Sequence, residues 1–201
     1  SGWAVGAKIH STYSETPIAS PAMRDALAVV AEFDVPVLVH TWGPDIVDLA
    51  AAVAEVGGVR AIAAHTGGPA WRLAADAAET TDRIYFEPAW SLPDAGRIRW
   101  LLDRVGVQRF LFGSDSTLID PAIALGSIAA AKPSVEEARA VLVENAVTLF
   151  GLDRPGVIAP AIRERVESSV SWAETADQTA IREALDPDPG AGTAVQDRHE
   201  H

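Results

Sequence analysis

The sequence predicts an α/β fold whose parallel sheet forms part of a (β/α)8 barrel, and three observations lead to this prediction. Three short apolar runs, Val35 to His40, Arg60 to His65 and Arg109 to Asp115, have the character of strands buried on both faces. Each run ends on a His or Asp just before a turn, where an α/β barrel keeps its catalytic groups. Helical segments separate the runs, and this alternation predicts parallel strands joined by right-handed crossovers.

The first part of the chain predicts two strand–helix units. A short strand over Val5 to His10 is followed by Ser20-Pro21, which begins a helix with Ser as N-cap and Pro in the first turn. The strand Val35 to His40 is followed by a helix over Asp45 to Val56, which Gly57-Gly58 ends.

Three further strands complete the predicted sheet. They are strand 60–65 with a helix after Gly67-Gly68, strand 83–87 with a helix from Pro93 to Gly106, and strand 109–115. Ser134-Val135-Glu136-Glu137 is a capping box that begins a strong helix. Five units in about 150 residues fall short of the roughly 250 residues of a whole barrel. We therefore expect residues 1–152 to form the C-terminal portion of a barrel.

The end of the chain has a different pattern. Residues 153–185 have helical spacing of apolar residues, so we expect a helical appendage there. Residues 186–201 have no apolar pattern and are expected to be a disordered tail.

Composition excludes several classes of protein. The 201 residues carry a net charge of −12, which argues against nucleic-acid partners and anionic membranes, and no run is long enough to span a membrane. Without cysteine there is no disulfide framework, zinc finger or thiol nucleophile. We expect a cytoplasmic protein that acts on a small-molecule substrate.

Three strand ends could form a metal-assisted site. Such a site needs neutral imidazole and carboxylate ligands on one cation, with a position open for water. His40 could supply an imidazole, and Asp115 could supply a carboxylate that also accepts a proton from the water. His65 could be a ligand or a general acid/base. Taken singly, His40 would be interpreted as a core histidine and Asp115 as a cap or turn residue. Because a His or Asp ends each of the three predicted strands, a common site is the favoured interpretation.

Further residues are candidates for substrate binding. Lys8 and His10 lie two residues apart and so share one strand face. Lys8 could pair with an anionic substrate, be carbamylated to bridge two metals, or reach solvent, whereas His10 is expected to contact substrate. Trp42 and Trp90 each follow a strand closely and could line a pocket. Glu87 could be a polar pocket residue or a solvent-facing carboxylate, and the sequence favours neither interpretation.

A set of motifs in residues 5–152 gives the chain a family resemblance. The motifs are Gly6-Ala7-Lys8-Ile9-His10, Pro36-Val37-Leu38-Val39-His40-Thr41-Trp42-Gly43, Ala64-His65-Thr66-Gly67-Gly68, Phe112-Gly113-Ser114-Asp115-Ser116, Asn145-Ala146 and Leu149-Phe150-Gly151-Leu152. In these motifs and their order the chain resembles the amidohydrolase-related (amidohydrolase 2) family of metal-dependent hydrolases and decarboxylases.

The resemblance implies roles for the candidate residues. It makes the strands numbers 4 to 8 of a distorted TIM barrel, with His40 as the strand-5 metal ligand and Asp115 as the strand-8 ligand and proton acceptor. His65 matches the strand-6 histidine that polarises substrate or moves a proton, while Lys8 and His10 match a strand-4 motif of variable role. The family's first-strand His-x-His pair has no counterpart here. We therefore expect a fragment of a longer protein, rather than a chain completed by another or a degenerate remnant.

The function expected of the parent protein is that of a metal-dependent hydrolase, with zinc as the expected divalent metal. A metal-activated water would attack the carbonyl of a small organic acid, lactone or amide. The alternative within the family is a metal-dependent non-oxidative decarboxylase, and the alternative from another class is a non-catalytic half-barrel binding module. We expect the isolated chain to be inactive and, because its sheet has an open edge, to form a homo-oligomer or to dissolve poorly.

Overall fold

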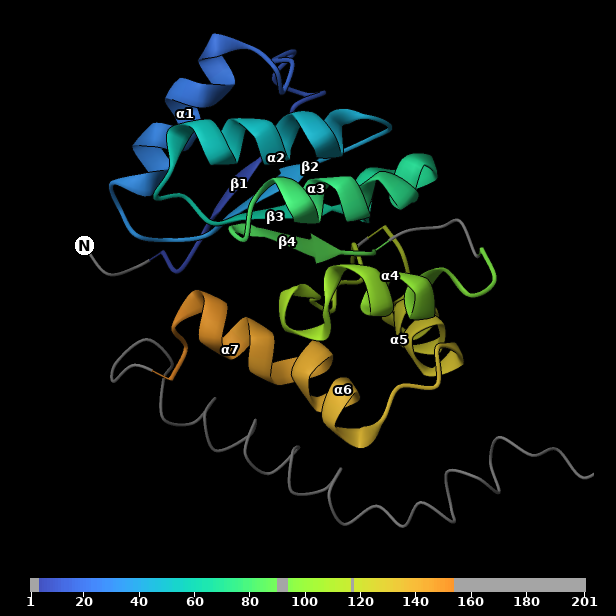
Figure 1. Ribbon diagram of the computed structural model, residues 1–201. Helices are drawn as coiled ribbons and strands as arrows, with labels where there is room; N and C mark the ends of the chain where they lie inside the picture. Colours follow the sequence, from blue (N-terminus) through green and yellow to red (C-terminus); the bar gives the residue numbers. More distant parts are fainter. Residues whose placement is uncertain (1–3, 90–93, 117, 154–201) are drawn as a thin grey trace, which may run out of the picture. The chain divides into compact units, whose positions relative to one another are not determined.

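The computed structural model describes residues 4–89, 94–116 and 118–153. Within them, one parallel sheet holds four strands in sequence order, and helices separate the strands along the chain (Figure 1). The strands are β1 (Ala7–Ile9), β2 (Val37–His40), β3 (Ala61–Ala64) and β4 (Ile84–Glu87). This arrangement confirms the predicted α/β class. The expected appendage over 153–185 and the tail over 186–201 lie, apart from Asp153, outside the described residues.

The strand register assigns side chains to two faces of the sheet. Lys8 pairs with Leu38, Leu38 with Ile62, and Ile62 with Tyr85, while His40, Ala64 and Glu87 are in register two residues further along. Residues in register share a face, as do residues two apart in a strand. We call this face the inner face. On β2, β3 and β4 the opposite, outer face carries alternating residues that are all fully buried, namely Val37, Val39, Ala61, Ala63, Ile84 and Phe86, whereas on β1 it carries the half-buried Ala7 and Ile9.

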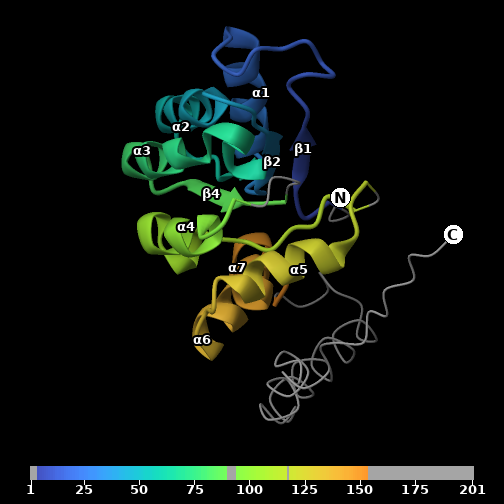
Figure 2. The same ribbon diagram turned by 90° about the vertical axis from the view of Figure 1, so that its right-hand side faces the viewer.

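Four helices form a row along the outer face of the sheet. They are α1 (Pro21–Ala31), α2 (Asp45–Val56), α3 (Ala74–Thr80) and α4 (Arg97–Val105), and each packs against the next (Figure 2). α1 begins where the sequence predicts, and Ser20 caps it by accepting from the Met23 N–H. α2 both begins and ends where the sequence predicts. Each large apolar side chain buried between helices and sheet stabilises the fold by about 1.5–3 kcal/mol.

The predicted strand over 109–115 is wrong as a regular strand. Val107–Arg109 forms a short 3-10 turn, η2, and only Phe110 makes a bridge to Phe86. The N–H of Leu111 donates to Phe86 O, but the next N–H, of Phe112, donates to Val141 O. In the described part of the chain no further strand lies beyond this segment. The Phe112 N–H therefore bonds to a helix carbonyl, and strand pairing with β4 stops after the Phe86–Phe110 bridge.

The described chain ends in helices that the sequence predicts only in part. Ser134 and Glu137 form the predicted capping box at the start of α6 (Val135–Arg139), which continues through a π-helical turn, η3 (Ala140–Glu144), into α7 (Asn145–Phe150). α5 (Pro121–Ala130) was not predicted, although Asp120 caps it and Pro121 begins it. None of the described helices combines the length and the apolar character needed to cross a bilayer.

Candidate active site

Three histidines meet where the strands end. His10 follows β1, His40 ends β2, and His65 follows β3. The rings of His10 and His40 stack with centroids 4.1 Å apart, and the ring of His65 meets His40 edge-on at 4.8 Å. Parallel strands place these side chains at one edge of the sheet, which we call the mouth. The predicted convergence of His40 and His65 is therefore present.

Aromatic side chains flank the histidines. The Tyr13 ring stacks on His10 at 3.8 Å. The Trp42 ring lies 6.3 Å from His40 and 6.2 Å from His65, and it is 38% exposed. A Cβ on Gly68 would lie 2.8 Å from the Trp42 ring, so a glycine is needed for the indole to pack on this backbone. The structure thus places Trp42 beside His40 and His65, although it is not among the residues that line the cavity there, whereas Trp90 lies outside the described residues.

A strained turn carries His65. His65, Thr66, Gly67 and Gly68 all have left-handed φ values of 62°, 49°, 74° and 54°, and they begin the 3-10 segment η1 (His65–Leu73). Such values are costly for residues with a Cβ and persist only where the surroundings impose them. Here the buried Thr41 hydroxyl donates to Ala64 O at 2.6 Å and accepts from Gly67 N at 3.0 Å. The sequence predicted a turn at Gly67-Gly68, but not its extension to His65.

A carbonyl fixes the protonation of one His65 ring nitrogen. Nδ1 lies 2.5 Å from Ala89 O, and a carbonyl oxygen can only accept, so Nδ1 carries the proton. His65 is 8% exposed and is one of the residues that line a cavity at the mouth. With Nδ1 committed to Ala89, the ring nitrogen that can meet a ligand in the cavity is Nε2.

Glu87 is a buried carboxylate beside the histidines. It is 8% exposed and accepts the N–H of Ala89 and the N–H of His65. Burial raises its pKa to about 7, although these two N–H groups, and after them the charge of Lys8, act in the opposite direction. A Cβ on Gly113 would overlap its carboxylate oxygen. Of the two interpretations left open by the sequence, the structure selects the pocket residue.

The cavity at the mouth has a volume of about 330 Å³ and brings together opposite charges. Lys8, His65, Glu87 and Asp115 contribute to its wall, and apolar residues of the inner face and of the helices complete it, namely Leu38, Ile62, Leu111, Phe112, Ala146 and Phe150. A small organic anion would find a cation, carboxylates and an imidazole within one cavity.

The charges at the mouth act on one another. Burial, followed by the charges of His10, His65 and Lys8, lowers the pKa of His40 to about 4. Burial first, and then the charges of Lys8 and His65, also lowers the pKa of His10. Burial lowers the pKa of Lys8, against the pull of Glu87 and Asp115. His40 is consequently a neutral imidazole at pH 7, the form that binds metal.

The donor set suits a divalent metal in kind but is incomplete in number. The neutral imidazole of His40 and the carboxylate of Asp115 are ligand types that zinc and manganese accept. Asp115 is exposed on its turn, and its charge acts on the pKa of His40. Within the described residues, however, no group of three or more His, Asp or Glu side chains could hold a metal ion. His40 and Asp115 thus fit as two ligands of a site that needs others.

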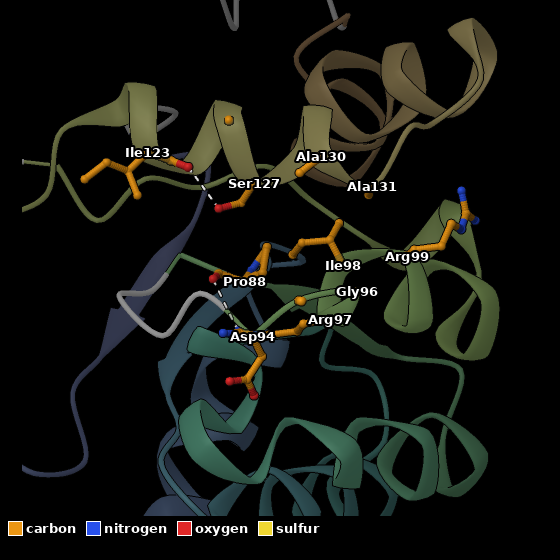
Figure 3. A pocket seen from close by; sticks show the side chains of 12 residues that line it. Pro88, Asp94, Gly96, Arg97, Ile98, Arg99, Ile123, Ser127, Ala130 and Ala131 are labelled. Carbon is orange, nitrogen blue, oxygen red and sulfur yellow. Dashed lines mark hydrogen bonds between the residues drawn. The ribbon is translucent and has the colours of Figure 1, made fainter. Parts of the chain in front are cut away.

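A second cavity lies away from the histidines. It has a volume of about 290 Å³ and lies between α4 and α5, with Arg97 and Pro88 on one side and Ile123 and Ser127 on the other (Figure 3). None of the predicted site residues lines it. Its relevance is that Arg97 reaches from it to the backbone of His65, where its guanidinium donates to the carbonyl oxygen at 3.2 Å.

Comparisons with known proteins identify the family. The family model described as "Amidohydrolase" matches residues 3–152, so the chain belongs to the amidohydrolase family. This confirms the resemblance found in the sequence. A search among curated proteins finds no match.

Solved structures share the fold at low sequence identity. A putative 2-pyrone-4,6-dicarboxylic acid hydrolase from Pseudomonas putida is 19% identical over 69% of this chain and 59% of its own, with a TM-score of 0.56. An uncharacterised TIM-barrel protein from Bordetella bronchiseptica is 15% identical over 68% and 53%, with a TM-score of 0.58. A dihydroxybenzoic acid decarboxylase from a Polaromonas species, described with bound manganese, is 15% identical over 70% and 57%, with a TM-score of 0.55.

These likenesses establish a TIM-barrel relationship. The chain spans 53–59% of the length of these three structures, and its four strands form part of such a barrel. In a TIM barrel the active site lies at the C-terminal ends of the strands, which is the edge where the histidines meet. The family's solved members include both hydrolases and decarboxylases.

Proposed function

We propose that the whole protein is a metal-dependent hydrolase of the amidohydrolase family, acting on a carbonyl of a small organic acid, lactone or amide. The observation that carries this proposal is the gathering of His10, His40 and His65 at the mouth, with Lys8 and Asp115 close enough to act on the pKa values of His10 and His40. A fold alone would need no such cluster of polar groups at strand ends.

In this proposal, His40 and Asp115 are two of the ligands of a divalent metal, zinc being our expectation, and ligands outside the described residues complete its coordination. The metal, when bound, supplies Lewis acidity toward a carbonyl and toward water. Neutrality of His40 at pH 7 supports its part in this role.

The remaining roles belong to the chain's own side chains. Asp115 accepts a proton from the attacking water. His65, held with its proton on Nδ1, presents the lone pair of Nε2 to the substrate, where it can accept a proton or a hydrogen bond. Lys8, which lines the cavity, binds the anionic part of the substrate. His10 and Trp42, which lie against His40 and not among the residues that line the cavity, contact the part of the substrate that extends beyond it.

A decarboxylase is the second candidate function. It is favoured by the decarboxylases among the solved relatives, and the same cation-lined cavity would hold an aromatic carboxylate. The two reactions differ in product, because hydrolysis opens a lactone or amide whereas decarboxylation releases CO2. One assay panel of lactones, amides and hydroxybenzoates therefore tests both.

The experiment uses the native protein, stripped of metal with a chelator and then supplied with Zn²⁺ or Mn²⁺. We expect metal-dependent turnover that falls by about 100-fold or more in Asp115→Asn and in His40→Gln. Asp25→Asn on α1, whose carboxyl is exposed, is the matched control and should keep full activity. Absence of stoichiometric metal together with absence of turnover would instead support the non-catalytic binding module.

A further inference from the structure

The turn that carries His65 is held from outside by the segment that follows β4. Three residues reach it, namely Glu87 at the end of β4, Ala89 in the segment after it, and Arg97 at the start of α4. Glu87 is a buried carboxylate to which the proposed chemistry assigns no task. Its two hydrogen bonds nevertheless both concern His65, because one is to the His65 N–H and the other is to Ala89, whose carbonyl oxygen meets the His65 ring.

The hydrogen bonds around Glu87 form a closed loop. Its carboxylate accepts the N–H of His65 and the N–H of Ala89. The carbonyl oxygen of Ala89 in turn accepts the proton on His65 Nδ1. Glu87 therefore holds the backbone at both ends of the hydrogen bond that determines which ring nitrogen of His65 is protonated.

Arg97 connects the same two segments a second time. Its buried guanidinium donates to His65 O at 3.2 Å and to Pro88 O at 3.4 Å, the latter drawn as a dashed line in Figure 3. The N–H and the carbonyl of His65 are thus both bound, one by a carboxylate and the other by a guanidinium. This explains how a non-glycine residue keeps a φ of 62°.

Close packing keeps the Glu87 carboxylate in place. Gly113 lies against it so tightly that a Cβ there would reach 2.2 Å from Oε1. Because no side chain fits between them, the carboxylate is confined to one position, between Gly113 and the two N–H groups. The position of Glu87 is therefore set by the segment that leads to Asp115.

We propose that Glu87 is the positioning residue of His65, fixing both its left-handed peptide and its Nδ1–H tautomer so that Nε2 faces the substrate. This inference rests on the proposed function only in giving His65 a substrate to act on. The positioning itself is a property of the chain and can be measured without substrate or metal.

The test is nuclear magnetic resonance of the 201-residue chain labelled with ¹⁵N-histidine at pH 8, with His65→Gln to assign the signals. We expect well-separated His65 nitrogen resonances, pyrrole-like for Nδ1 and pyridine-like for Nε2. Glu87→Gln has an NH2 group where the carboxylate has an acceptor, so it cannot serve both N–H groups equally well. Its two His65 resonances should move toward each other as the tautomers mix.

A matched control and a second variant separate positioning from general destabilisation. Glu55→Gln makes the same chemical change on α2, where the side chain is exposed and paired with Arg24, and should leave His65 unchanged. Gly113→Ala keeps the carboxylate but displaces it, and should shift His65 as Glu87→Gln does. His65 signals that stay at their wild-type positions in both site variants would overturn the proposal.

The native chain supplies a measurement that needs no variant. Scalar couplings across the hydrogen bonds should join the amide nitrogens of His65 and Ala89 to the Glu87 carboxyl carbon. If these couplings are absent, or if native His65 carries its proton on Nε2, Glu87 does not position the ring.

The two proposals fail separately. A native protein without turnover would refute the hydrolase while leaving the His65 spectrum to decide on Glu87. In an active protein, Glu87→Gln should lower kcat by about 10- to 100-fold, as is typical of groups that orient a catalytic ligand or base. An unchanged kcat would contradict the positioning role even if hydrolysis is confirmed.

Discussion

The two faces of the sheet differ most on β2 and β4, although they share one backbone, whereas β3 is apolar and buried on both faces. On β4, Phe86 lies on the outer face and is fully buried against helices, while Glu87, one residue later, lies on the inner face among charged groups. On β2, Val39 and His40 divide in the same way. Burial of the apolar side chains on the outer face stabilises the fold. Burial of the charged side chains at the mouth costs folding free energy.

This contrast shows that the outer face stabilises the fold and that the mouth carries the groups able to do chemistry. The row of helices over the outer face supplies the burial that holds the sheet, so the mouth can keep groups whose pKa values are displaced by burial. Shifts of this kind cost folding free energy and tend to gather at functional sites. The contrast can be tested by changing one face at a time.

The largest effect is expected on the outer face. Phe86→Ala removes a fully buried ring and should lower the free energy of unfolding by about 3–5 kcal/mol. Leu38→Ala, on the inner face where the side chain is only half-buried, should cost about 2 kcal/mol or less. Urea denaturation followed by circular dichroism measures both. Equal losses would mean that the two faces contribute equally to stability.

The next effect is a pH dependence in which two groups of the mouth oppose each other. The pKa of Glu87 is raised from 4.5 to about 7 in the folded state, so its stabilising contribution is complete below pH 4.5 and is lost as the pH rises through 7. The pKa of His40 is lowered from 6.5 to about 4, so stability is lost as the pH falls from 6.5 to 4. In the native chain the two slopes counteract each other.

Single variants should uncover each slope in the metal-free protein. Glu87→Gln leaves the His40 slope, so stability should fall on acidification from pH 6.5 to 4. His40→Gln leaves the Glu87 slope, so stability should rise by at most about 3 kcal/mol on acidification from pH 7 to 4.5, at 1.36 kcal/mol per pKa unit. Urea midpoints across this range measure both. Parallel pH profiles of the two variants would contradict the assignment.

A smaller effect is expected at Gly113, where the inner face meets the segment leading to Asp115. Gly113→Ala forces a Cβ onto the Glu87 carboxylate and should lower the free energy of unfolding by about 1–3 kcal/mol. The loss of stability should vanish in the Glu87→Ala background, because the carboxylate that the new Cβ would meet is then absent. A loss that persists there would have to come from the backbone instead.

The smallest effect, of opposite sign, is expected away from both faces. Gly126 lies inside α5, and a Cβ there would have nothing within 4 Å. Gly126→Ala should therefore stabilise the chain by about 0.5–1 kcal/mol, through the helix propensity of alanine. Thermal unfolding would show a raised midpoint, and a lowered midpoint would mean that the cavity beside α5 cannot accept a methyl group.

Local patterns in the sequence predicted much of the fold. α2 was predicted with its bounds, Asp45–Val56, because its periodicity is strong and glycine ends it. The capping box at Ser134 was confirmed for the same reason, since its signal lies within four residues. α5 was missed because its residues are apolar on all sides and give no amphipathic face, although the pair Asp120-Pro121 is a helix-start signal that could have found it.

Features that depend on contacts across the chain were beyond a sequence reading. The run Arg109 to Asp115 has the composition of a strand, but pairing requires a neighbour, and Phe112 bonds to a helix carbonyl instead. The gathering of His40 and His65 was predicted, because parallel strands bring their ends together. The orientation of Glu87 was not, because it follows from N–H groups at positions 65 and 89 that only the folded backbone aligns.

The in-register pairing of the four strands has an evolutionary consequence. Because neighbours alternate between faces, sliding one strand by a single residue would bring Val39 to the mouth and turn His40 into the helix-covered core. Point substitutions in the strands thus change one face at a time, whereas insertions within a strand are tolerated only in steps of two. Divergence among such proteins should accordingly collect in the connecting loops.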